Sequence, residues 1–87
     1  MYSKTVTVAN YVGLHSRPAT FLVNKATDFK SSVWIEKGSR RVNAKSLLGV
    51  LSLGVSKDEE ITLIAEGDDE QSAVEALIAL IESDFAE

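Results

Sequence analysis

Residues 13–29, GLHSRPATFLVNKATDF, contain the segment that decides the fold. Its apolar residues have the spacing of one buried helical stripe, made of Ala19, Leu22, Val23, Ala26 and Phe29. Pro18 is tolerated only in the first turn of a helix, because proline has no backbone N–H to donate. The helix is therefore expected to begin near Ser16, with His15 or Ser16 as its N-cap.

Strands are expected on both sides of this helix. Alternation of apolar and polar residues predicts them at residues 2–9, 33–37, 40–43 and 61–66. Gly38 and Ser39 suit the two-residue turn of a hairpin between the second and third strands. Half-buried, alternating strands favour a mostly antiparallel sheet that helices cover on one face only.

Two further helices complete the predicted order. A short helix is expected at 46–53, closed by Gly54, and a last helix is expected to start at Gly67 or Asp68. The order is β-α-β-β-α-β-α, an α+β fold. The 87 residues leave room for one domain, which we place at residues 1–87.

Composition excludes several classes of protein. The chain has no cysteine, which rules out disulfides, thiol catalysis and cysteine–zinc sites. Residues 1–10 do not resemble a signal peptide, and no apolar stretch approaches the roughly 20 residues that span a bilayer. We therefore expect a cytoplasmic protein without membrane insertion.

Charge is distributed unevenly along the chain. Residues 1–45 carry eight Lys or Arg and two acidic residues, whereas residues 46–87 carry one lysine and eleven acidic residues. A basic patch around His15 is one hypothesis, and an evenly solvated surface is the alternative. The net charge of −4 is atypical of nucleic-acid binders, so we expect no direct nucleic-acid contact. An acidic protein partner or a small anion fits better.

His15 is the only histidine, and four roles are open to it. It is a structural loop residue, a metal ligand, a catalytic base or a phosphoryl acceptor. A metal site would need carboxylates from the other half of the chain, and a base acting on Ser16 would need neighbouring side chains to face each other.

The phosphoryl role finds support in the neighbouring residues. A neutral imidazole is nucleophilic near pH 7, and a helix N-terminus offers free N–H groups to phosphate oxygens. Arg17 supplies a fixed cation, and Gly13 leaves an open approach for a partner enzyme. The residues around His15 therefore offer candidates for each requirement of phosphoryl transfer.

Ser46 and the leucines after it form a second candidate site. Ser46 suits the N-cap of the short helix, where a phosphate would also be tolerated. Leu47, Leu48 and Leu51 share one side of that helix, while Val50 and Leu53 share another. One set is expected to face the core and the other a partner; burial of both sides is the alternative.

The first helix also has an outer side. Arg17, Thr20, Phe21 and Asn24 lie opposite its buried stripe. Phe21 is thus expected to be a large aromatic residue outside the core. Together with the leucines of the short helix it is expected to contribute to a protein-binding patch.

Two segments together resemble the HPr family, the histidine-containing phosphocarriers of the bacterial sugar phosphotransferase system. GLHSRPA (13–19) is similar to the family pattern G-[IL]-H-A-R-P-A, and VNAKSLLGVLSLGV (42–55) to its regulatory-serine segment. The resemblance covers all 87 residues. It implies an open-faced β-sandwich, in which a four-stranded antiparallel sheet carries three helices on one face.

The resemblance also implies a function. His15 would accept a phosphoryl group at Nδ1 from enzyme I, with help from Arg17, and pass it to the IIA components of sugar permeases. Such a carrier is a substrate of enzymes, not an enzyme, and needs neither metal nor cofactor; we expect a monomer. The docking surface is expected to include Thr20, Phe21, Asn24, Leu47, Leu48 and Leu51.

Ser46 carries the second implied role. It matches the serine that HPr kinase/phosphorylase phosphorylates, in a form that acts as corepressor of the catabolite control repressor. The alternative function is a regulatory paralogue that acts mainly through Ser46, although known paralogues of that kind lack the active histidine. The chain departs from the family pattern at Ser16, where alanine is usual; its hydroxyl is a possible phosphate contact.

Overall fold

A computed structural model describes residues 1–85. Their order of elements is the predicted one: β1 (Tyr2–Val8), α1 (Ser16–Thr27), β2 (Ser32–Lys37), β3 (Arg40–Asn43), α2 (Leu47–Ser52), β4 (Glu59–Glu66) and α3 (Glu70–Glu82). The α+β fold class is therefore confirmed. The hairpin turn at Gly38 and Ser39 and the short helix closed before Gly54 lie where the sequence predicts them.

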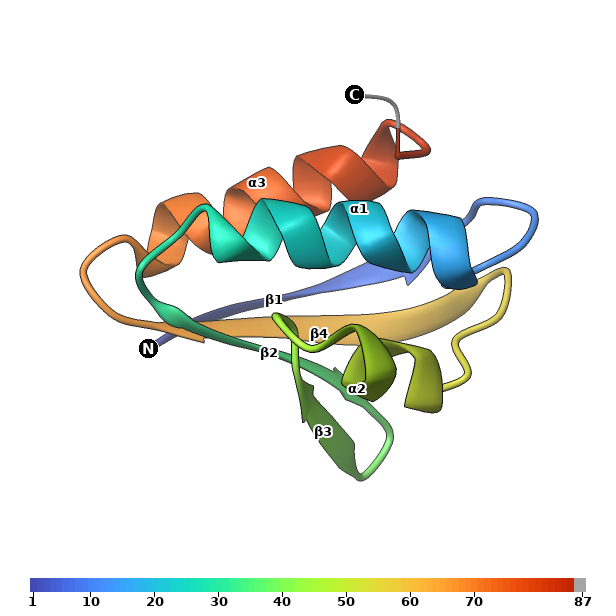
Figure 1. The fold of residues 1–87 in the computed structure, drawn as a ribbon, viewed down its shortest axis with the longest axis horizontal. Coiled ribbons are helices and arrows are strands. Elements are labelled where there is room, and N and C mark those ends of the chain that lie inside the picture. The colour runs from blue at the N-terminus through green and yellow to red at the C-terminus, as the bar shows by residue number, and fades with distance from the viewer. Residues whose placement is uncertain (86–87) are drawn as a thin grey trace.

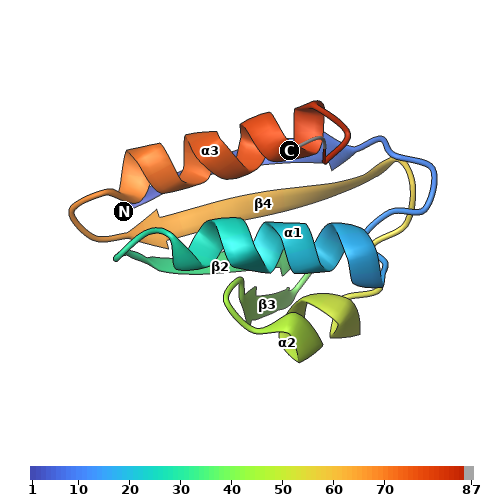
Figure 2. The ribbon, with the colours of Figure 1, turned by 45° about the horizontal axis from the view of Figure 1, so that its top comes forward.

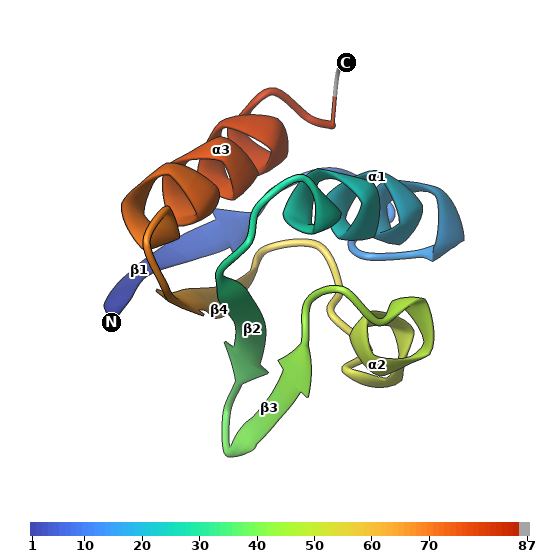
Figure 3. The ribbon, with the colours of Figure 1, turned by 60° about the vertical axis from the view of Figure 1, so that its left-hand side comes forward.

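The four strands form one sheet in the order β1-β4-β2-β3, and every neighbouring pair is antiparallel. Helices α1 and α3 lie side by side over the sheet, and α2 lies on the same side beyond them, next to β3 (Figures 1 and 3). The opposite face of the sheet carries no helix. This is the open-faced arrangement that the alternating strands predict.

The core lies between the sheet and the helices. Alternate strand residues point inward, among them Val8, Ile35 and Leu63, and all three are fully buried. The stripe of α1 meets them through Leu22, and α3 does so through Leu77. Burial of the α1 stripe is what sets the helix on the sheet and fixes the direction in which its N-terminus projects.

The last helix starts later than the sequence predicts. Its N-cap is Asp69, not Gly67 or Asp68, and its first residue is Glu70. Gly67 has a φ of +150° and turns the chain, while its N–H donates to Glu70 Oε1 at 3.1 Å. This turn uses the two residues that were expected to begin the helix.

Asp69 anchors the far end of α1. Its carboxylate accepts the backbone N–H groups of Lys30 and Ser31, each at 2.9 Å, and the Ser31 hydroxyl. These hydrogen bonds favour the charged carboxylate, the Ser31 hydroxyl most of all, and lower the pKa of Asp69 to about 2. Asp69 thus joins the start of α3 to the α1–β2 connection, a link that the sequence pattern did not show.

Protonation of Asp69 is expected to weaken the fold in acid. Because the folded pKa of about 2 lies below the usual 3.8, this carboxylate stabilises the protein above about pH 4 and loses that effect as the pH falls toward 2. Asp69→Asn is therefore expected to lower the Tm at pH 7. The difference in Tm between this variant and the unsubstituted protein is expected to become smaller toward pH 2. Circular dichroism melts across this range measure it.

Asp68→Asn is the matched control for this prediction. Asp68 is adjacent and exposed, and no side-chain hydrogen bond of Asp68 is found among the described residues. Its Tm is expected to follow that of the unsubstituted protein at every pH. A constant gap for Asp69→Asn from pH 7 to pH 2 would show that the carboxylate charge is not the cause.

Candidate functional site

His15 stands at the N-terminus of α1. It is the N-cap residue, with extended backbone angles (φ −77°, ψ −175°), and its carbonyl oxygen accepts a hydrogen bond from Ala19 N at 2.9 Å. Its imidazole makes no capping hydrogen bond, and the residue is exposed. The predicted helix start is confirmed, and the ring is accessible from solvent.

Pro18 explains why a histidine is tolerated at this position. An N-cap side chain accepts from the second or third backbone N–H of the helix. Pro18 is the third residue of α1 and has no N–H, so a better capping side chain would find one partner, Arg17 N. The N–H groups of Ser16 and Arg17 have no hydrogen-bond partner within residues 1–85. They remain available to an anion at the helix start.

The loop before α1 is fixed by hydrogen bonds. Asn10 Nδ2 donates to Gly13 O at 2.8 Å, and Gly13 N donates to Asn10 O at 3.1 Å. Leu14 N donates to Val55 O at 2.9 Å. This last bond ties the loop to the connection between α2 and β4, and the two run side by side in Figure 2. His15 therefore follows a loop whose conformation is held by hydrogen bonds.

Gly13 has a different role from the one expected. It is buried, has a φ of +67°, and a Cβ added to it would lie 2.4 Å from Val55 O and 2.8 Å from Ser56 Cα. Glycine is needed here because two backbone segments approach closely in a left-handed conformation. The expectation that it keeps the approach to His15 open was wrong.

Two shallow hollows flank the start of α1. The first, which we call the His15 hollow, has a volume of about 390 Å³ and is lined by Leu14, His15, Ser16, Leu51, Gly54, Val55 and Ser56. The Ser16 hydroxyl in it makes no hydrogen bond to any residue of the described chain, 1–85. Ser16 instead contributes its carbonyl oxygen, which accepts from Thr20 Oγ1 at 2.7 Å.

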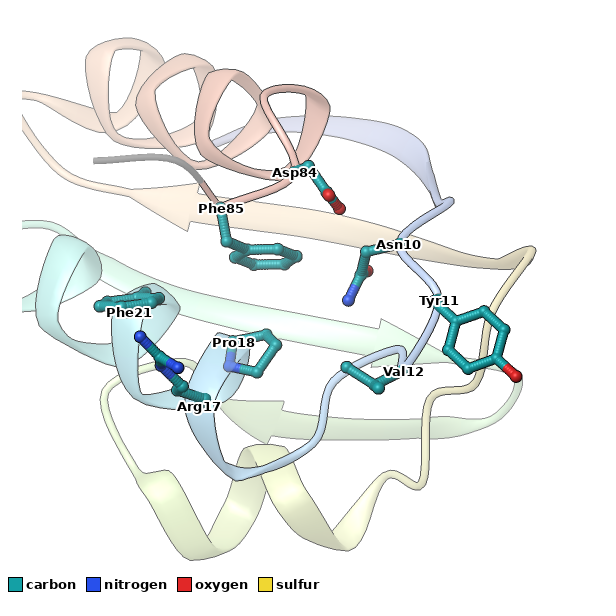
Figure 4. A pocket seen from close by; sticks show the side chains of 8 residues that line it. All are labelled: Asn10, Tyr11, Val12, Arg17, Pro18, Phe21, Asp84 and Phe85. Atoms are coloured by element: carbon teal, nitrogen blue, oxygen red, sulfur yellow. The ribbon is translucent and has the colours of Figure 1, made fainter.

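The second is the Arg17 hollow, also about 390 Å³ (Figure 4). It is lined by Asn10, Tyr11, Val12, Arg17, Pro18, Phe21, Asp84 and Phe85. Arg17 is exposed, and no ion pair holds its guanidinium in the part of the chain that the structure describes. His15 and Arg17 thus line different hollows.

Phe21 is half-buried rather than exposed on the outer side of α1. After α3 the chain turns through Asp84 and Phe85, both with a φ of 62°, and the Phe85 ring is buried. Phe21 and Phe85 line the same hollow in Figure 4, and Phe21 packs against the core. The sequence missed this contact because the segment after α3 has no periodic pattern. A role of Phe21 in partner binding stays a prediction.

Ser46 is the N-cap of α2. Its Oγ accepts a hydrogen bond from Gly49 N at 3.1 Å, as the capping pattern predicts. Gly49 lies close to it, since a Cβ there would be 3.2 Å from Ser46 Oγ. The capping role is confirmed, and phosphorylation of this hydroxyl stays a prediction.

The leucines after Ser46 divide as one of the two alternatives predicts. Val50 and Leu53 are buried, whereas Leu48 is 81% exposed and Leu47 38% exposed. Leu51 is half-buried and packs against the core. Burial of both sides of α2 was therefore wrong. Thr20 and Asn24 are exposed on α1, which contacts α2, whereas Phe21 and Leu51 are half-buried, and the partner-binding patch stays a prediction.

The basic half of the chain is not gathered around His15. Arg17 is the one basic residue among the described residues that line the two hollows. Other cations meet carboxylates elsewhere: Lys37 with Glu59 at 3.0 Å, and Arg41 with Glu36 at 3.4 Å. The alternative of an evenly solvated surface therefore describes the protein better.

Two absences hold for residues 1–85. No three His, Asp or Glu side chains are grouped so that they could hold a metal ion, and no helix has the length and apolar character needed to cross a membrane.

Comparison with protein families gives one match over nearly the whole chain. Residues 2–83 match the family described as the phosphotransferase-system HPr component phosphorylation site. A relative in Halalkalibacterium halodurans, the HPr-like protein Crh, is 49% identical over 84 residues, which is 97% of this chain and all of the relative.

Solved structures of an HPr and of a Crh are similar to this fold. HPr-C-His from Thermoanaerobacter tengcongensis has a TM-score of 0.96 at 49% identity, covering 100% of this chain and 98% of that one. Crh of Bacillus subtilis, described as a catabolite repression protein that forms a domain-swapped dimer, has a TM-score of 0.78 at 44% identity with full coverage of both chains. The relatives thus include an HPr and a regulatory homologue.

Gly13→Ala is expected to destabilise the protein by about 2 kcal/mol or more, because the methyl group meets the Val55 carbonyl and the backbone is left-handed. Gly38→Ala is the matched control, since Gly38 has a φ of +60° and no atom lies within 4 Å of its added Cβ. It is expected to cost about 1 kcal/mol. Urea unfolding measures both, and equal losses would exclude the close approach as a cause.

Proposed function

Because this chain belongs to the HPr family, we propose that it handles phosphoryl groups at two places. His15 carries a phosphoryl group that comes from phosphoenolpyruvate through enzyme I and passes to the IIA components of sugar permeases. Ser46 is the site at which a kinase changes the protein into a regulator of carbon catabolite control. The protein is a substrate in both reactions and not itself an enzyme.

The observation that carries the first role is the exposed, uncapped imidazole of His15. A lone pair on its neutral ring attacks the phosphorus of the donor, the donor's P–N bond breaks, and a P–N bond to His15 forms. The reverse sequence delivers the group to the acceptor.

The residues beside His15 have supporting roles in this proposal. The N–H groups of Ser16 and Arg17 face the helix start and favour the phosphoryl oxygens. The Arg17 side chain swings from its own hollow to pair with them, which its lack of an ion-pair partner in residues 1–85 allows. The Ser16 hydroxyl is free to donate one further hydrogen bond.

The relatives favour the regulatory role more strongly than the carrier role. Two matched proteins, from Halalkalibacterium halodurans and Bacillus subtilis, are named Crh, and the second is described as a catabolite repression protein. In this role HPr kinase/phosphorylase modifies Ser46 and the catabolite control repressor binds the product. The presence of His15 is the reason that we propose phosphoryl carriage in addition to regulation.

Helix α2 provides a physical link between the two sites. It begins after Ser46, presents Leu47 and Leu48 to solvent, and contributes Leu51 to the His15 hollow. A phosphate on Ser46 adds about −1.5 to −2 charges beside the exposed leucines. A partner that docks on this patch to reach His15 would therefore meet a changed surface.

The site of action and the oligomeric state are parts of the same proposal. Enzyme I, the kinase and the repressor act in the cytoplasm, so we place this protein there. The expected monomer stays a prediction, because the Bacillus subtilis Crh structure is described as a swapped dimer at 44% identity. Sedimentation velocity over a range of protein concentrations measures it.

Phosphoryl carriage is tested with enzyme I and labelled phosphoenolpyruvate. The protein is expected to take up an acid-labile label, and His15→Ala is expected to take up none while its stability stays within about 0.5 kcal/mol, since the exposed ring makes no capping bond. If the unsubstituted protein took up no label while enzyme I was active on another HPr, the carrier role would be refuted. Only the regulatory role would then remain.

Regulation is tested with HPr kinase/phosphorylase and ATP. An acid-stable label is expected that Ser46→Ala abolishes, at a stability cost of about 1 kcal/mol for the lost cap. Ser52→Ala is the matched control, because Ser52 lies on the same helix and its hydroxyl donates to Gly49 O. Label that persists in Ser46→Ala and disappears in Ser52→Ala would place the modification elsewhere.

The coupling of the two sites has its own readout. Ser46-phosphorylated protein is expected to accept the acid-labile label from enzyme I about tenfold more slowly or worse, because the docking patch has changed charge. An unchanged rate would mean that enzyme I does not dock on α2.

A further inference from the structure

A small polar hollow lies at the end of α1 remote from His15. It has a volume of about 160 Å³ and is lined by Lys30, Ser31, Ser32, Val33, Trp34, Asn43 and Lys45. Its walls come from the α1–β2 connection, the start of β2 and the segment between β3 and α2 (Figure 1). The length of α1 separates it from His15 by about 18 Å.

Hydrogen bonds between these segments build the hollow. Lys45 Nζ donates to Phe29 O at 2.8 Å, and Ala44 N donates to Val33 O at 2.8 Å. Asn43 Oδ1 accepts from Lys45 N at 2.9 Å. The segment before α2 is thus hydrogen-bonded to the α1–β2 connection and to the start of β2. The hollow is therefore formed without a ligand.

The charged residues that line the hollow are both positive. Two of its lining residues, Lys30 and Lys45, are cations, and no lining residue is acidic. Lys45 is half-buried, and its Nζ meets a neutral carbonyl, although an ammonium has two further N–H donors. No ion pair of either lysine is found in residues 1–85. A half-buried cation without a counter-charge favours an anion beside it.

One carboxylate, that of Asp69, makes hydrogen bonds to residues that line the hollow. Asp69 accepts the backbone N–H groups of Lys30 and Ser31 and the Ser31 hydroxyl. It does not line the hollow, and its hydrogen bonds come from the α1–β2 connection. It therefore orders the wall while the two lysine ammonium groups stay unpaired.

We propose that this hollow binds a small phosphate-bearing anion, either free phosphate or a phosphate monoester. The two ammonium groups supply charge, and the Ser32 hydroxyl and the Asn43 amide supply further donors. A compact site with several donors suits a tetrahedral anion with several oxygens. The site goes beyond the proposed function, since it uses neither His15 nor Ser46.

Trp34 gives this site a built-in reporter, because it lines the hollow and is the only tryptophan of the chain. The full-length protein is titrated with inorganic phosphate and, separately, with glycerol 3-phosphate, at constant ionic strength kept with sodium chloride. A saturable change in Trp34 emission is expected. Amide shifts in ¹H–¹⁵N spectra are expected at residues 30–34 and 43–45. Tighter binding of one probe identifies its class.

Lys45→Gln is expected to weaken phosphate binding about tenfold or more, and Lys30→Gln to weaken it less, since Lys45 is the more buried cation. Lys25→Gln is the matched control: it removes the same charge from the last turn of α1 but lies outside the hollow. Thermal melts confirm that each variant folds, so a loss of binding is not a loss of fold.

Three outcomes would overturn the site. If Lys45→Gln bound phosphate with the same affinity as the unsubstituted protein, Lys45 would not be part of the site. The same emission change with chloride alone would mean an adventitious ion only. Amide shifts confined to residues 13–17 would place the phosphate solely at the start of α1.

Discussion

The hydrogen bond from Leu14 N to Val55 O is the constraint on which the site depends. It holds the loop before α1 against the connection after α2, and the close approach of Gly13 to the same carbonyl leaves no room for a side chain. Through this contact the position of His15 and the position of α2 are set together. The hollow between them is therefore a property of the fold, present without a partner.

The sequence predicted the elements well because each had a local signal. The stripe of α1, the position of Pro18 and the alternation of the strands are periodic or stereochemical features that a reader finds within a few residues. Ser46 as a cap belongs to the same kind of evidence. His15 was found because it is the only histidine and stands at a helix start.

What the sequence did not reveal are contacts between segments distant along the chain. The last helix was expected to start at Gly67 or Asp68, but Asp69 is its N-cap, and the Asp69 carboxylate accepts hydrogen bonds from the connection after α1. Phe21 was placed outside the core, but it is half-buried, packs against the core and lines the same hollow as Phe85, which follows a turn with no periodic pattern. Arg17 was expected to assist a phosphoryl group on His15, and its side chain lines the neighbouring hollow. Spacing gives proximity of backbones and leaves the rotamer open.

Pro18 limits how tightly the start of α1 can hold an anion. A full helix N-terminus offers several amide donors, but here the proline removes the third and the structure leaves two, those of Ser16 and Arg17. An anion held by few fixed donors is stabilised little, so its departure is not strongly opposed. Weak stabilisation of the phosphoryl group at this helix start would favour its rapid transfer to an acceptor over its retention on the protein.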